Sequence, residues 1–79
     1  MSEPAEVEAR FGADGEVSVL RFTWGGRWHP AMSHGRRWEA PDGYHCLVMA
    51  PGERIFELVF DGAHRAWRAA PVAPASAKA

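Results

Sequence analysis

The sequence predicts a small all-β domain, on the evidence of its turn spacing and of the residues between the turns. Glycines recur about every nine or ten positions, and several follow Asp or Pro, as in Asp14-Gly15 and Pro51-Gly52. Turn signals at ~8–12-residue spacing are typical of small antiparallel β-proteins. Val, Phe, Trp, Leu and Ile fill the gaps, and these residues favour a pleated, half-buried surface. We therefore expect an antiparallel meander of about six strands, closed or half-closed as an SH3-like or OB-like barrel.

The expected strands lie between these turns. Their ranges are 5–11, 17–24, 27–34, 36–40, 44–50, 54–60 and 65–69. Ranges 27–34 and 36–40 form one bent strand if the chain kinks at Gly35, because glycine inside a strand often marks a bulge or a corner. The strands make one domain over residues 5–70. Residues 71–79 are mostly Ala and Pro, which bury little apolar surface, so we expect a disordered tail.

The Gly25-Gly26 pair predicts a two-residue hairpin that places Trp24 opposite Arg27. Two glycines supply the positive φ angles that such tight hairpin turns require. Pro30, on the returning strand, cannot donate a hydrogen bond to a ladder. We therefore expect that strand to lie at a sheet edge or to be bulged.

The turn at Pro51-Gly52 predicts the next hairpin. If these two residues alone form the turn, Leu47 lies opposite Phe56, and Cys46 lies opposite Glu57 on the other face. Side chains on one face of such a pair stabilise the sheet by contact across the strands.

The last hairpin is predicted from a four-residue loop at residues 61–64, which places Leu58 opposite Trp67 and Glu57 opposite Arg68. Combined with the preceding hairpin, this register defines one core face. Its expected members are His45, Leu47, Met49, Phe56, Leu58, Phe60 and Trp67.

The opposite face of the predicted sheet is also apolar. Apolar residues that cluster at a surface often mark an interface. Closure of the sheet within the chain would cover them, and so would a second subunit, which makes a homodimer through the sheet one expected arrangement. The candidate interface residues are Tyr44, Val48, Ile55 and Val59.

The chemically reactive residue types form no convincing catalytic or metal-binding pattern. A metal site needs three or four ligands that converge, and the single cysteine excludes a disulfide framework and a multi-cysteine zinc site. His45 and Cys46 are neighbours on a strand, so they point to opposite faces. The three aspartates each precede glycine, where they favour turns. We expect a non-enzymatic protein with no catalytic residues, no cofactor and no metal.

The charges are unevenly distributed although the net charge is only −1. Residues 1–16 hold five acidic residues and one arginine, whereas residues 21–37 hold four arginines and no acidic residue. Arginine beside exposed aromatics suits single-stranded nucleic acid, because cations track the phosphates and bases stack on the rings. The alternative is a purely structural role, in which the tryptophans are core residues and the Arg–Trp pairs are stacking contacts within the fold. The candidate nucleic-acid-binding residues are Arg27, Trp28, Arg36, Arg37 and Trp38.

The sequence contains no apolar run near the ~20 residues that span a bilayer. The first residues, 1–6, are acidic and lack the apolar region of a signal peptide. We therefore expect no membrane partner and a cytoplasmic location.

A set of short motifs resembles a family of small bacterial domains of unknown function, with the pattern F-x-W-x-G-R, then W, then F-E-L, then W. The resemblance covers roughly residues 10–69, and the chain departs from the pattern at residues 30–32. Some members look to be encoded beside translesion-type DNA polymerases, which implies a nucleic-acid-repair context by association. No catalytic residue is established for that family. The residues that carry the resemblance are Asp14-Gly15, Phe22-Thr23-Trp24-Gly25-Gly26-Arg27, Gly35-Arg36-Arg37-Trp38, Leu47-Val48, Phe56-Glu57-Leu58, Asp61 and Trp67.

Three functional hypotheses follow from the sequence, of which the third is an enzyme or a metal protein that uses the histidines. The first is a non-enzymatic interaction module that binds a protein partner or forms a homodimer through its sheet. The alternative is a weak single-stranded nucleic-acid-binding protein that uses the Arg/Trp residues of the segment 21–38.

Overall fold

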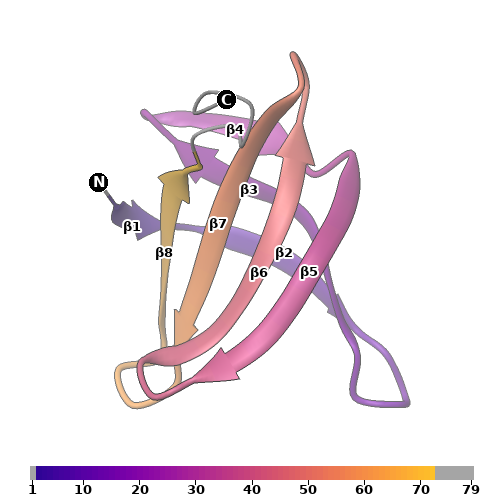
Figure 1. The fold of residues 1–79 in the computed structure, drawn as a ribbon, viewed down its shortest axis with the longest axis vertical. Helices are drawn as coiled ribbons and strands as arrows, with labels where there is room; N and C mark the ends of the chain where they lie inside the picture. Colours follow the sequence, from indigo (N-terminus) through magenta and orange to yellow (C-terminus); the bar gives the residue numbers. More distant parts are fainter. Residues whose placement is uncertain (1, 73–79) are drawn as a thin grey trace, which may run out of the picture.

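The computed structural model describes residues 2–72, which form eight β-strands in two antiparallel sheets (Figure 1). The strands are β1 (Glu3–Ala5), β2 (Val7–Phe11), β3 (Val17–Trp24), β4 (Arg27–Pro30), β5 (Ser33–Ala40), β6 (Gly43–Ala50), β7 (Arg54–Asp61) and β8 (Ala66–Pro71). One sheet has the order β1-β8-β7-β6-β5 and the other has the order β2-β3-β4. The all-β prediction is confirmed. In Figure 1 the three-stranded sheet lies behind the five-stranded sheet, and its strands run across the others.

The chain passes from one sheet to the other at two corners. Only Glu6 separates β1 from β2, and its backbone N–H donates to Thr23 Oγ1 (2.9 Å) while its carbonyl accepts from Thr23 N (3.0 Å). Between β4 and β5, Ala31 N donates to Leu20 O (3.0 Å) and Met32 N donates to Met49 O (2.7 Å). The sheets meet at these corners but do not close, so of the two expected forms the closed barrel is not formed.

The predicted bent strand breaks earlier than expected. The break between β4 and β5 falls at residues 31 and 32, and Gly35 lies inside β5. The pairing of β5 with β6 shifts register between His34 and Arg37, so Gly35 lies in a bulge. Of the two roles predicted for Gly35, a bulge or a corner between two strands, the structure shows the bulge.

The Gly25-Gly26 hairpin is confirmed. Both glycines have positive φ angles, 62° and 77°, and Trp24 lies opposite Arg27. β4 is an edge strand of its sheet, as Pro30 predicted.

The hairpin between β6 and β7 differs from the prediction by one residue. Its turn contains Pro51, Gly52 and Glu53, and Glu53 adopts a positive φ of 60°. Val48, rather than Leu47, therefore lies opposite Phe56. A one-residue slip moves every side chain of a strand to the other face. The predicted core members His45, Leu47 and Met49 are thus wrong, and the inward residues of β6 are Tyr44, Cys46, Val48 and Ala50.

The hairpin between β7 and β8 differs from the prediction by two residues. Phe60 lies opposite Trp67, and Val59 rather than Glu57 lies opposite Arg68. An even shift preserves the faces, because side chains alternate with a period of two. Phe60 and Trp67 therefore share the predicted face.

The core lies where the two sheets face each other. Phe22 of β3 and Phe56 of β7 are both fully buried, and their ring centroids lie 5.0 Å apart. A bulge at Leu20 lets Val19 and Phe22, three positions apart, both point inward, and it leaves Leu20 52% exposed. The buried core comprises Val19, Phe22, Cys46, Val48, Ala50, Phe56, Leu58 and Ala69.

The strands reach beyond the predicted domain limits at both ends. β1 begins at Glu3, and Pro71 lies opposite Phe56 in β8. The backbone N–H of Val72 donates to Ile55 O (2.8 Å). The rest of the predicted tail, residues 73–79, lies outside the described residues.

The register of β6 can be tested by placing a lysine on each face of the strand. Val48→Lys should lower the free energy of unfolding by more than about 3 kcal/mol, because it leaves an unpaired charge in the core. Leu47→Lys should retain a cooperative transition, since position 47 faces outward opposite Glu57, with which lysine can pair. Urea denaturation followed by circular dichroism measures both. The reverse order of stabilities would contradict the observed register.

Candidate functional site

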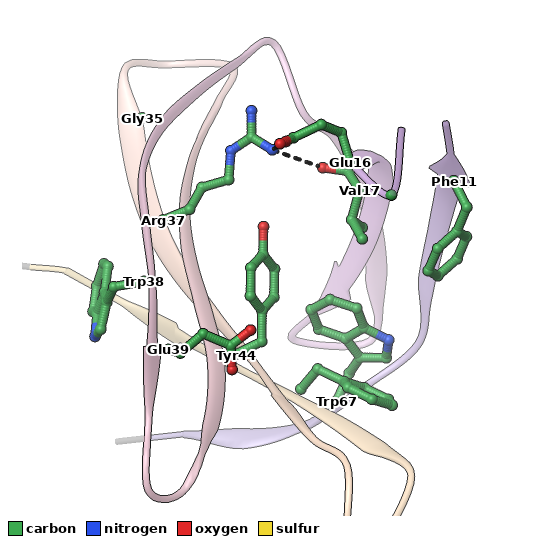
Figure 2. A pocket seen from close by; sticks show the side chains of 11 residues that line it. Phe11, Glu16, Val17, Gly35, Arg37, Trp38, Glu39, Tyr44 and Trp67 are labelled. Atoms are coloured by element: carbon green, nitrogen blue, oxygen red, sulfur yellow. Dashed lines mark hydrogen bonds and ion pairs between the residues drawn. The ribbon is translucent and has the colours of Figure 1, made fainter. Parts of the chain in front are cut away.

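A cleft of about 770 Å³ opens between the two sheets (Figure 2). Its floor is a row of three aromatic residues across neighbouring strands: Tyr44 of β6 pairs with Phe60 of β7, which pairs with Trp67 of β8. The Phe60 and Trp67 rings are 5.2 Å apart and tilted by 48°. Phe11, at the end of β2, lines the same cleft from the other sheet. These side chains come from both ends of the chain, so the cleft exists only in the folded protein.

The aromatic floor is uncovered because the two sheets differ in extent. β2 and β3 end their pairing at Phe11 and Val17, and the turn between them lines the cleft with Gly15 and Glu16. Phe11 consequently remains 72% exposed, the highest value for any large apolar residue in the described part of the chain. Tyr44 and Trp67 pack on the buried core with one side. The cleft thus combines a partly buried aromatic floor with an exposed aromatic rim.

The polar groups of the cleft include Glu39 and an ion pair that joins the two sheets at the mouth of the cleft. Arg37 Nη1 of β5 donates to the Glu16 carboxylate and to the backbone carbonyl of Val17 (3.3 Å) (Figure 2). Both charged side chains are exposed, so water screens the pair and its net contribution to stability is small. Such a pair can exchange partners when a charged group enters the cleft.

The five predicted nucleic-acid-binding residues do not form one surface, and the adjacent Arg27 and Trp28 point to opposite faces of their sheet. Arg27 and Trp28 belong to β4, in the three-stranded sheet, where the Trp28 ring contacts Arg21 (4.1 Å) rather than Arg27. Arg37 points into the cleft. Of the five, the structure brings together only Arg36 and Trp38. The guanidinium carbon of Arg36 lies 5.1 Å from the centroid of the Trp38 ring. In Figure 2, Trp38 lies on the side of β5 away from the other labelled side chains.

The four predicted interface residues are divided between the two faces of the five-stranded sheet. Val48 is 1% exposed and belongs to the core, so its assignment to an interface is wrong. Tyr44 lies in the cleft floor. Ile55 and Val59 do face outward, away from the three-stranded sheet. The one-residue slip explains this division, because it reversed the faces of β6 but not those of β7.

His45 lies between two carboxylates on the outward face of the five-stranded sheet. Its Nδ1 is 2.6 Å from Glu57 Oε2 and its Nε2 is 2.7 Å from Asp42 Oδ1. Its ring stacks on Trp38, with centroids 5.0 Å apart, and the residue is only 8% exposed. The two carboxylates, Asp42 foremost and then Glu57, raise the pKa of His45 against the opposing effect of burial. His45 in turn lowers the pKa of Asp42.

Sequence reasoning missed this cluster for a definite reason. The predicted register put His45 and Glu57 on opposite faces, and Asp42 was assigned to turn formation alone. The three-residue spacing of Asp42 and His45 around the β5–β6 turn is the signal that could have been used.

Cys46 is buried in the core and carries the chain's one thiol group. Burial raises the pKa of the Cys46 thiol to about 11, so the thiol stays protonated at neutral pH. Among residues 2–72 no group of three or more His, Cys, Asp or Glu side chains is placed to hold a metal ion. The same part of the chain contains no helix of the length and apolarity needed to cross a bilayer.

Comparison with protein-family models, with curated proteins and with solved structures gave no match. The resemblance to small bacterial domains therefore stays a prediction.

The His45 cluster predicts how stability depends on pH. A raised histidine pKa adds stability in full below the ordinary value of 6.5, and this stability is lost as pH rises through the folded-state pKa. The lowered pKa of Asp42 adds stability above pH 3.8, the ordinary pKa of an aspartate. This stability is lost as the pH falls through the lower pKa that Asp42 has in the folded protein. The melting temperature should therefore be highest between pH 3.8 and 6.5 and should decrease on either side.

Thermal melts across this pH range test the effect, with two histidine variants as comparison. His45→Gln should remove the decrease on the alkaline side, whereas His64→Gln, at an exposed loop histidine, should keep it. A melting temperature of the unmodified protein that rises from pH 6.5 to pH 8 would refute the assignment.

Proposed function

We propose that this chain is a non-enzymatic interaction module and that the cleft between its sheets is the binding site. The observation that carries the proposal is the aromatic row Tyr44, Phe60 and Trp67, which lies open at the floor of the cleft. Concave sites lined by aromatic side chains with a few polar groups are the usual form of binding pockets. The ligand that suits this cleft is an apolar or aromatic side chain of a protein partner.

The dimensions and the rim support this choice. The volume of about 770 Å³ lies within the ~300–1,000 Å³ typical of ligand pockets. Phe11 at the rim exposes most of its ring, and exposed aromatics that become buried on association often dominate binding energy. The Arg37–Glu16 pair at the mouth offers charged contacts at the edge of the apolar floor. This is the arrangement of a protein interface, with an apolar centre and a polar periphery.

Selection from a displayed library of short random peptides, followed by isothermal titration, tests the proposal. Phe11→Ala should weaken the selected peptides about tenfold or more, because burial of a phenyl ring contributes ~1.5–3 kcal/mol. Leu20→Ala is the matched control, since Leu20 is also exposed and also lies on the three-stranded sheet, but outside the cleft. Equal affinities for the two variants would refute the cleft as the site. Sedimentation equilibrium of the free protein shows whether the partner is a second copy.

Single-stranded nucleic acid is the second candidate ligand, favoured by the contact of Arg36 with the Trp38 ring. We expect tryptophan quenching by a short oligonucleotide to weaken steeply with salt if phosphates are bound. Trp38→Ala should then abolish the quenching while Trp28→Ala keeps it. Absence of quenching at low salt would eliminate this candidate.

A further inference from the structure

The two sheets expose four edge strands, and one of them differs from the rest. β1, β2 and β4 have three, five and four residues, whereas β5 has eight, with a bulge between His34 and Arg37. An edge strand presents unpaired backbone N–H and C=O groups, and short edges are one way in which proteins limit unwanted pairing. β5 is thus the one long edge of the described chain, and it pairs only with β6.

The same strand borders the proposed binding cleft. Arg37 and Glu39 of β5 pair with Cys46 and Tyr44 of β6, whose side chains point inward, and both β5 residues line the cleft. Side chains along a strand alternate between faces. An extended segment added beside β5 would therefore send every second side chain over the cleft, toward Tyr44 and the aromatic row. Backbone pairing and insertion of apolar side chains can be performed by one peptide.

The positive charge of Arg36, on the outward face of β5, indicates which side chains the outward face of such a peptide should carry. Arg36 lies over Trp38, and within the described chain no carboxylate lies within ion-pair distance of it. Because Trp38 lies on the outward face opposite His45, Arg36 meets the outward side chains of an added strand. A carboxylate is the complementary group. A second copy of β5 would instead bring Arg36 and Arg37 near their own like charges, which disfavours self-pairing.

We infer that the partner of this module is an extended peptide segment that alternates acidic with apolar residues and adds to the five-stranded sheet along β5. The inference rests on the proposed function of the cleft and specifies its ligand. The apolar residues enter the cleft, the acidic residues meet Arg36, and the peptide backbone completes the edge.

The experiment uses a short capped peptide that alternates Glu with Phe and two N-methylated forms of it. One form carries methyl groups on the backbone nitrogens of the Glu residues and the other on those of the Phe residues. Along one edge of an extended chain only alternate N–H groups point to the neighbouring strand. Edge pairing therefore predicts that one methylated form loses at least about tenfold in affinity while the other binds like the parent peptide.

The outcomes separate this inference from the proposed function. If both methylated forms bind like the parent and Phe11→Ala still weakens binding, edge pairing is overturned and the cleft stands. If both lose binding alike, or if the parent peptide does not bind, the inference is also overturned. A parent peptide whose affinity is equal for the unmodified chain and Phe11→Ala contradicts the cleft itself.

Two arginine variants test whether Arg36 recognises the acidic residues of the peptide. Arg36→Gln should weaken the Glu/Phe peptide about fivefold or more and reduce the salt dependence of binding, because it removes the outward cation. Arg27→Gln, at an exposed arginine of the β3–β4 hairpin, should leave both unchanged. Equal binding of a peptide that alternates Lys with Phe would overturn the acidic character of the partner.

Discussion

The three-residue turn at Pro51–Glu53 decides which way every side chain of β6 points, because a strand paired one residue earlier or later reverses its faces. With this turn, Val48 enters the core against Phe56, and Tyr44 becomes part of the cleft floor. The same turn puts His45 outside, between its carboxylate partners and beneath Trp38. Core, cleft and histidine cluster are therefore three consequences of one local choice of backbone conformation.

A second constraint acts through the unequal extent of the two sheets. The ring contact of Phe22 with Phe56 joins them at the centre, and the bulge at Leu20 lets β3 direct both Val19 and Phe22 to that contact. Three strands cannot cover the whole inner face of five. The part of that face left over is the aromatic floor, and Phe11 stands beside it from the sheet that ends too early to cover it. Exposure of apolar surface here is a result of the architecture and not of an isolated residue.

Features set by local chain geometry could be predicted from the sequence, and features set by distant contacts could not. The Gly25-Gly26 hairpin is specified by two residues that accept positive φ, and Pro30 indicates an edge strand or a bulge because it cannot donate to a ladder. Glu53 gives no such signal, because a non-glycine residue with positive φ is uncommon, and the β6 register was therefore misassigned. The cleft joins Phe11 to Trp67 across most of the chain, so no motif could reveal it.

Neighbours in sequence were also a poor guide to a shared surface. Arg36, Arg37 and Trp38 are consecutive, yet a bulge and strand alternation direct the Arg37 side chain into the cleft and place the Arg36 and Trp38 side chains together on the outward face. As a result, β5 carries Arg37 on the face toward the cleft, and Arg36 and Trp38 on the outward face. Trp38 stacks on His45, which forms hydrogen bonds to Glu57 of β7 and to Asp42 of the preceding turn, so the Trp38 side chain is tied to two neighbouring elements. Side chains that are already held in place lose little conformational entropy on binding, and a partner's affinity then depends mainly on how well its own side chains match the two faces.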